Sequence, residues 1–207
     1  MDSTTWFDVI DVFGVLVGAI TGALVARRLG YDIAGLWGLA LVSGLGGGML
    51  RDTLLQAGPP LALTEPVYLP TVFLSTGAVA VCATRINRLN RLIRISDAIA
   101  IAGFAVAGTL RTIDVGLGVW PTLLLGVITA IGGGMIRDVL IGETPSIFLK
   151  SEFTALAALA ASAVVLICHE IDTPRGITIL IGLTVGVVLR LGSYRWGWTS
   201  WAPSRVE

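Results

Sequence analysis

Apolar residues follow one another in long blocks along this chain, rather than alternating with polar residues. Crossing a bilayer as a helix takes roughly 17–25 mostly apolar residues. Seven blocks qualify, at about 7–26, 33–55, 67–84, 97–113, 117–140, 153–170 and 176–193. Their continuity excludes a membrane β-barrel, whose strands alternate with period two. The pattern therefore predicts an all-α integral membrane protein with seven transmembrane helices.

Composition supports this class and narrows the range of functions. Of 207 residues, 55% are hydrophobic and 14% are charged, whereas soluble domains carry about 25% charged residues. The formal net charge is zero, so no basic excess points to nucleic acid as a partner. The sequence contains no nucleophile–base set, Walker loop or metal-ligand cluster. We therefore expect neither an enzyme nor a cofactor.

A shift of 86 positions superimposes the first half of the chain on the second. It pairs glycines, prolines, charged residues and the two cysteines across three blocks without a gap. The chain is therefore predicted to be one domain, 1–207, with repeat units 8–84 and 94–170 and an extra helix, 176–193. Because each unit has three spans, the second enters the membrane from the opposite side. Such inverted repeats are typical of proteins that move solutes, with the site near the midplane.

Each repeat carries a glycine triplet in its second span, Gly46–Gly48 and Gly132–Gly134. A glycine costs about 1 kcal/mol relative to alanine in a helix interior. One interpretation is close helix packing, since small residues let membrane helices approach each other. The other is a pair of broken helices whose freed carbonyls coordinate a cation. Ser43 and Thr129 each stand three residues before a triplet. The recurrence at equivalent positions favours the second interpretation.

Charged residues flank these triplets and begin the repeats. Arg51-Asp52 and Arg137-Asp138 follow the triplets, either as helix-end ion pairs that reach the interface or as latches at the two mouths of a pathway. Asp11 and Asp97 fall early in the first span of each unit, as site acids or as helix-start residues. Arg111, late in the fourth span, is expected either to pair with an acid such as Asp114 or to occlude a pore.

The arginines and lysine predict the orientation in the membrane. Three fall towards the side of the N-terminus and eleven towards the other side. By the positive-inside rule the N-terminus is outside and the C-terminus is cytoplasmic. A cytoplasmic loop holds Arg85, Arg88, Arg91 and Arg94, which are expected to set the topology and to contact anionic lipid.

The doubled GGGxxRD motif on a chain of three plus three plus one spans resembles the prokaryotic branch of the trimeric intracellular cation (TRIC) channel family. That branch includes bacterial proteins described as putative glycine transporters, and the resemblance implies the inner (plasma) membrane of a prokaryote. The resemblance covers roughly residues 8–193. It implies a homotrimer with one pore per protomer, along the first, second, fourth and fifth spans, which conducts monovalent cations and favours potassium. Carried over to this sequence, the resemblance implies kinks at Gly46–Gly48 and Gly132–Gly134, with potassium near their backbone and Ser43 and Thr129 as pore-side hydroxyls.

Two further functions stay open from the sequence. A secondary carrier for a small solute such as glycine would use the same inverted repeat. A structural membrane protein without any pathway would use the glycines only for packing.

Overall fold

The chain folds into helices joined by short connections, in a computed structural model that describes residues 3–82, 86–149 and 153–198. The helices in chain order are α1 (Ser3–Arg28), α2 (Ile33–Leu55), α3 (Leu61–Thr64), α4 (Tyr68–Cys82), α5 (Ile86–Asp114), α6 (Val119–Leu140), the 3-10 turn η1 (Ser146–Phe148), α7 (Thr154–Glu170) and α8 (Arg175–Trp196). The described part of the chain contains no strand. The prediction of an all-helical protein is confirmed.

Five helices, α1, α2, α5, α6 and α8, are long and apolar enough to cross a membrane. The third and sixth apolar blocks of the sequence form the shorter apolar helices α4 and α7, of 15 and 17 residues. Short segments, α3 and η1, precede these two helices in equivalent places of the two halves. The protein is therefore a helical membrane protein with several spans.

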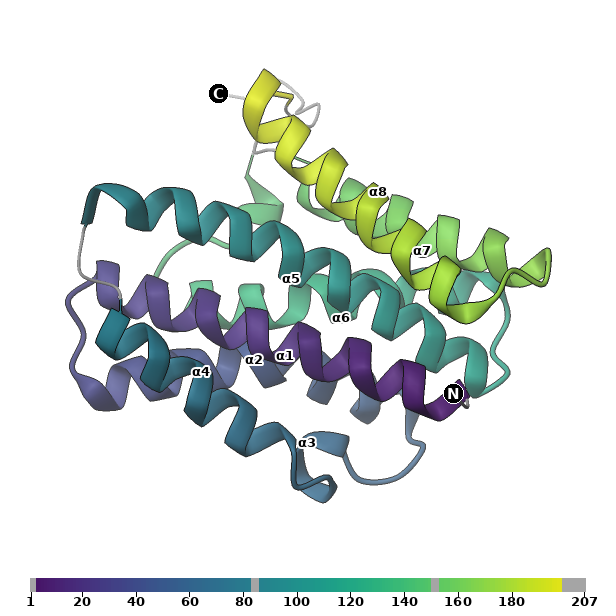
Figure 1. The fold of residues 1–207 in the computed structure, drawn as a ribbon, viewed down its shortest axis with the longest axis horizontal. Helices are drawn as coiled ribbons and strands as arrows, with labels where there is room; N and C mark the ends of the chain where they lie inside the picture. The colour runs from purple at the N-terminus through teal and green to yellow at the C-terminus, as the bar shows by residue number, and fades with distance from the viewer. Residues whose placement is uncertain (1–2, 83–85, 150–152, 199–207) are drawn as a thin grey trace, which may run out of the picture.

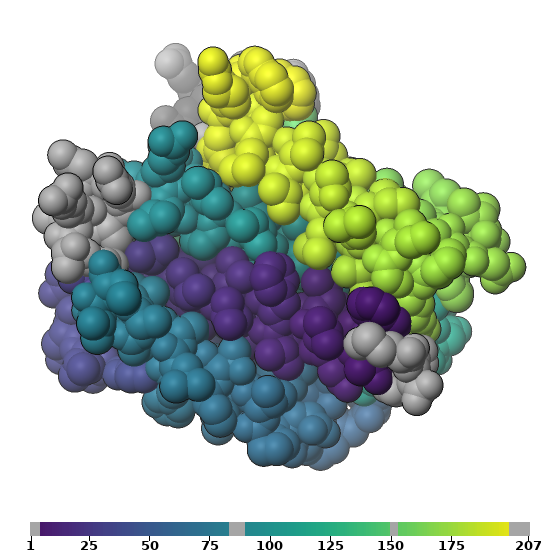
Figure 2. Space-filling view, viewed as in Figure 1, coloured from purple at the N-terminus to yellow at the C-terminus, as the bar shows by residue number. Residues whose placement is uncertain are grey.

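Four helices form the centre of the molecule. The most extensive contacts join α1 to α2, α1 to α5, α5 to α6 and α2 to α6, so these helices close a ring. Figure 1 shows α1 and α5 side by side across the middle of the view. Helix α4 covers α1 on one flank, while α7 and α8 cover α5 and α6 on the other. In Figure 2, α1 reaches the surface as a band between α4 and α5.

The glycine triplets do not break their helices, and this part of the prediction is wrong. Both α2 and α6 remain helical through them. A Cβ on Gly47 would stand 2.2 Å from the carbonyl oxygen of Thr129, and one on Gly133 would stand 2.5 Å from that of Ser43. The triplets therefore let α2 and α6 cross with their backbones in contact, which is the packing role of small residues in membrane helices. No break frees carbonyls there for potassium.

Two other predictions about helix ends are also wrong. Helix α5 begins at Ile86 rather than at 97, so Arg88, Arg91 and Arg94 lie in a helix and not in a loop, while Arg85 lies outside the described residues. Arginine is a good helix former, so a helix can extend beyond its apolar block. Asp11 and Asp97 consequently lie well inside α1 and α5, and neither starts a helix.

Helices α1 and α5 end in the same manner. Each is followed by a glycine with positive φ, Gly30 at +73° and Gly116 at +81°. The amide of the next residue, Tyr31 or Leu117, donates to the carbonyl of Ala26 or Thr112, five residues earlier. This left-handed termination favours glycine, which lacks a Cβ. The turns set the angle at which α2 and α6 return along the first helix of each half.

Candidate functional site

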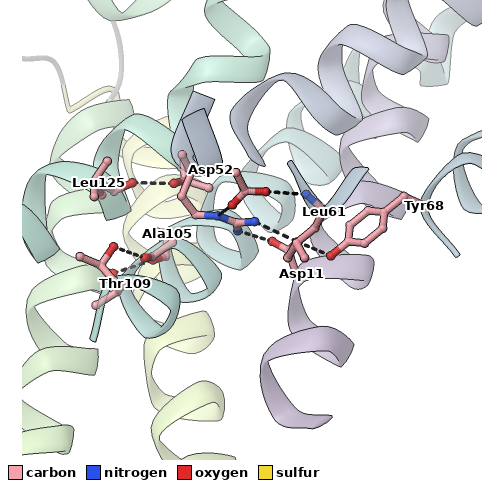
Figure 3. A network of polar contacts seen from close by, with 11 residues as sticks. Asp11, Asp52, Leu61, Tyr68, Ala105, Thr109 and Leu125 are labelled. Atoms are coloured by element: carbon pink, nitrogen blue, oxygen red, sulfur yellow. Dashed lines mark hydrogen bonds and ion pairs between the residues drawn. The ribbon is translucent and has the colours of Figure 1, made fainter. Parts of the chain in front are cut away.

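Asp11, Arg51, Asp52 and Tyr68 meet between α1, α2 and α4 and form what we term the first charge cluster. The Arg51 guanidinium donates from Nη1 to Asp11 Oδ1 at 2.6 Å and from Nε to Asp52 Oδ1 at 2.8 Å. The Tyr68 hydroxyl donates to Asp11 Oδ2 at 2.6 Å. The amide of Leu61, the first residue of α3, donates to Asp52 Oδ2 at 3.0 Å. Figure 3 shows these groups converging.

The first charge cluster is sealed from solvent. Arg51 is 0% exposed, Asp11 is 1% exposed and Asp52 is 6% exposed. Buried charges survive only when they are paired and hydrogen-bonded. Here one cation meets two carboxylates, and the tyrosine hydroxyl and the α3 amide supply the further donors. The cluster therefore ties α1, α2, α3 and α4 together at this end of the ring.

Asp97, Arg137, Asp138 and Arg190 form the second charge cluster, between α5, α6 and α8. Arg137 donates to Asp138 Oδ1 from Nε at 2.9 Å and from Nη2 at 2.7 Å. The Asp138 Oδ2 atom accepts from the amide of Ser146, the first residue of η1, at 3.4 Å. Asp97 accepts from Arg190 Nη2 at 3.2 Å, while Arg137 Nη1 stands 3.9 Å from Asp97 Oδ1.

The two clusters use equivalent residues in different arrangements. In the first, the arginine contacts the α1 aspartate directly. In the second, Arg137 pairs with its sequence neighbour Asp138, and Arg190 of α8 pairs with Asp97 of α5. The side chains of Arg137 and Asp97 are 11% and 19% exposed, against 1% and 2% for Arg51 and Asp11. The second charge cluster is therefore the more open one.

A cavity of about 40 Å³ lies beside the second charge cluster. A water molecule needs about 10–15 Å³ measured in this way, so the cavity has room for a few waters. Its polar lining comes from both halves of the chain: Thr21, Ser43, Asp97, Arg137, Asp138, Ser146 and Thr154. It reaches from the second charge cluster to the crossing of α2 and α6, where Ser43 and Gly133 line it.

Several predicted site residues lie elsewhere than expected. The Thr129 hydroxyl donates to the Leu125 carbonyl of its own helix at 2.6 Å, so it packs within α6. Gly48 and Gly134 face the guanidinium ends of Arg51 and Arg137, at 3.7 and 3.8 Å from where a Cβ would stand. A Cβ at the third glycine of each triplet would therefore make only ordinary van der Waals contact with the arginine that follows it.

Arg111 does not pair with Asp114, and that expectation is wrong. Asp114 instead pairs with Arg175 at the start of α8. The Arg111 guanidinium lies over the Phe7 ring, 5.4 Å from its centroid, and Arg51 lies 5.2 Å from the same centroid. Phe7 thus contacts two cations, as expected for an aromatic ring whose faces carry partial negative charge.

Sequence reasoning did not find Tyr68, Thr21 and Arg190 as members of the site. Tyr68 and Thr21 are common residue types that occur singly in apolar blocks. Arg190 was assigned only to the positive charges that set the topology. Its place inside an apolar block was the available signal, since ionisable residues within a span usually face the bundle interior.

Comparison with known proteins gives concordant matches. A family model described as "Glycine transporter" matches residues 8–84 and 94–170. The chain is 31% identical over 189 residues to the inner membrane protein YadS of Escherichia coli K12, covering 90% of this chain and 91% of that protein. It is 31% identical over 193 residues to the membrane protein YvgT of Bacillus subtilis 168, covering 93% and 94%.

Solved structures match as well. The TRIC trimeric intracellular cation channel orthologue from Rhodobacter sphaeroides superimposes with a TM-score of 0.85 and 32% identity, over 93% of this chain and 98% of that one. A TRIC cation channel solved to explain conductance superimposes with a TM-score of 0.84 and 31% identity, over 97% and 98%.

The fold and the site define a helical membrane protein of several spans, with a polar cavity and two charge clusters in a ring of four helices. The chain belongs to the bacterial family described as "Glycine transporter", within the prokaryotic branch of the TRIC proteins. The resemblance that rested on the doubled GGGxxRD motif is confirmed. The names of these relatives are those of channels and membrane proteins, consistent with a protein that is not an enzyme.

Proposed function

We propose that this protein is a cation channel of the bacterial inner membrane that conducts potassium. It works as a homotrimer in which each protomer holds its own pathway. The likeness to solved TRIC cation channels, at 31–32% identity over more than nine-tenths of the chain, supports the ion-channel function. The inner membrane location follows the relative YadS.

The proposed pathway runs through the ring of α1, α2, α5 and α6. The observation that carries it is the pair of charge clusters after the glycine triplets of α2 and α6, one sealed and one beside a polar cavity. Carboxylates at the mouth of a pore concentrate cations, and Asp97 and Asp138 supply them beside the cavity. The hydroxyls of Thr21 and Ser43 continue the polar lining towards the helix crossing.

This conformation is closed at the first charge cluster. Arg51 spans the distance between Asp11 on α1 and its own neighbour Asp52, and no solvent reaches it. A fixed guanidinium in this place blocks a cation both sterically and by charge. Opening requires Arg51 to release Asp11. The Arg111 guanidinium also lies over the Phe7 ring, and it adds positive charge beside this end of the pathway.

The proposal includes an inverted repeat of units 8–84 and 94–170, with α8 as the extra span. Contacts recur at equivalent positions: Gly47 meets the Thr129 carbonyl, and Gly133 meets that of Ser43. With seven spans, the N-terminus is outside and the C-terminus is cytoplasmic, so the second charge cluster faces the cytoplasm. In this proposal Arg91 and Arg94, both exposed on α5, contact anionic lipid on that side.

Planar-bilayer recording under opposed potassium and sodium gradients tests the channel. Purified protein should give unitary currents whose reversal lies near the potassium equilibrium potential. Native mass spectrometry of the same preparation should show three chains. Preparations that bind lipid and stay trimeric, yet remain electrically silent, would remove the channel proposal.

A carrier for a small solute such as glycine is the second candidate. The description of the matching family model and the unequal state of the two clusters favour it. A zwitterion such as glycine has a carboxylate, which can pair with a guanidinium, and an ammonium group, which can pair with a carboxylate. Arg137 and Asp97 offer these two partners. Counterflow assays separate the two functions, since a carrier shows saturable exchange of labelled glycine across a vesicle without unitary currents.

A further inference from the structure

Asp97 is the only carboxylate in the described charge clusters that contacts arginines from two different helices. Arg190 of α8 donates to its Oδ2 atom at 3.2 Å, and Arg137 of α6 stands 3.9 Å from its Oδ1 atom. The second distance is beyond hydrogen-bonding reach. A small side-chain movement would thus bring Arg137 into hydrogen-bonding contact with Asp97. Arg190 already makes such a hydrogen bond to the same carboxylate.

The first charge cluster shows what the closed alternative looks like. There, Arg51 reaches the equivalent carboxylate from Nη1 at 2.6 Å and from Nη2 at 3.4 Å, and the cluster is sealed. A buried carboxylate attracts the nearest cation strongly because water is excluded. If Asp97 had no other cation, Arg137 would be expected to close on it in the same way.

Contacts of α8 with its neighbours restrain Arg190 beside Asp97. Gly186, one turn before Arg190, packs against Ala102 of α5, where a Cβ would stand 2.7 Å from the alanine Cβ. The guanidinium of Arg190 lies over the ring of Tyr194, 4.4 Å from its centroid. Arg190 itself is only 3% exposed. Backbone contact on one side and an aromatic ring on the other therefore restrict where its guanidinium can go.

We propose that Arg190 is a positioning residue that keeps the second charge cluster open, because it occupies Asp97 and thereby prevents Arg137 from sealing the cavity. Helix α8, which lies outside the two repeat units, becomes the element that controls the cytoplasmic entrance. The inference rests on the proposed function for its meaning in conduction, but its structural claim concerns access to the cavity alone.

Access to the cavity can be measured without any current. Ser43 lines its inner end, so Ser43→Cys in a background of Cys82→Ser and Cys168→Ala supplies a thiol there. The probe is the silver ion, a monovalent cation that reacts with thiols, applied to protein in lipid nanodiscs. The fraction of thiol left is read by maleimide labelling after denaturation.

Arg190→Gln should slow silver modification of this thiol by about tenfold or more, since Arg137 then seals the cluster. Adding Asp97→Asn should restore the parental rate, because Arg137 no longer has a carboxylate to close on. The matched control is Arg175→Gln, which removes the other arginine of α8 that pairs with an aspartate of α5. It should leave the rate unchanged.

An unchanged rate in Arg190→Gln would overturn the inference, as would equal slowing in Arg175→Gln. Slowing that Asp97→Asn does not reverse would also overturn it, since a general loosening of α8 would then explain the effect. If Arg190→Gln does not fold, Arg190→Lys and Asp97→Asn alone are compared, and a slow rate in the latter refutes the idea. Bilayer currents from the parent protein report separately on the channel itself.

Discussion

Replacing Tyr68 by phenylalanine removes one hydroxyl from the first charge cluster and leaves the aromatic ring in place. That hydroxyl donates to Asp11 Oδ2 at 2.6 Å, and the tyrosine is 3% exposed. A hydrogen bond to a charged group contributes about 1.5–3 kcal/mol to the state that contains it. If the bond exists only in the closed state, Tyr68→Phe raises the open-to-closed ratio by about tenfold to a hundredfold.

The assay is the open probability of single channels in planar bilayers, with thermal unfolding measured on the same preparations. Tyr31→Phe is the matched control, because Tyr31 is 43% exposed and lies away from the first charge cluster. The expected result is a higher open probability in Tyr68→Phe at unchanged unitary conductance. An open probability equal to or below the parent, together with a lower melting temperature, would show that the bond supports the fold in both states and is no latch.

Three further outcomes are expected. Gly47→Ala should destabilise the protein by about 1–3 kcal/mol through overpacking against the Thr129 carbonyl. Gly48→Ala should be neutral, because the added Cβ would stand 3.7 Å from the Arg51 guanidinium, an ordinary contact distance. Equal denaturation midpoints for the two variants would contradict the packing role. Arg51→Gln should cost about 3–5 kcal/mol because it strands buried carboxylates, and Arg137→Gln should cost less in the same unfolding assay. A thiol at Ser3→Cys should react with an impermeant maleimide added outside intact cells; labelling only after lysis would reverse the predicted topology.

Hydropathy located the helices well because burial in a bilayer demands apolar residues at nearly every position. It located their ends poorly where the ends are polar. Helix α5 begins eleven residues before its apolar block, since the arginines within 86–96 are good helix formers that contribute no hydropathy. For the same reason the sequence suggests Asp97 as a possible helix start, although Asp97 lies inside α5 and belongs to the second charge cluster.

The glycine triplets were misread because intrinsic propensity and packing make opposite predictions for them. Propensity penalises glycine in an isolated helix, but a second helix in backbone contact offsets that penalty. The partner of Gly47 is a carbonyl on α6, far away in sequence. Its equivalent, Gly133, meets a carbonyl on α2. Only the shift of 86 residues hinted that the two triplets face each other.

Arg190 could not be assigned from the repeat for a related reason. The shift of 86 residues predicts the equivalence of Asp11 with Asp97, and of Arg51 with Arg137. It says nothing about α8, which has no counterpart. From the repeat alone, the second charge cluster would be equivalent to the first. Arg190, which comes from a helix outside the repeat, makes the two clusters different.

This difference bears on the choice between channel and carrier. A carrier must close one entrance whenever it opens the other, which requires the two halves to rock against each other. Here α2 and α6 meet through backbone contacts at Gly47 and Gly133, which leave little room for such a movement. In the function that we propose, each entrance instead depends on its own arginine, Arg51 at the first charge cluster and Arg190 at the second. If the two entrances open independently, both can be open at once, and that condition favours a channel over a carrier.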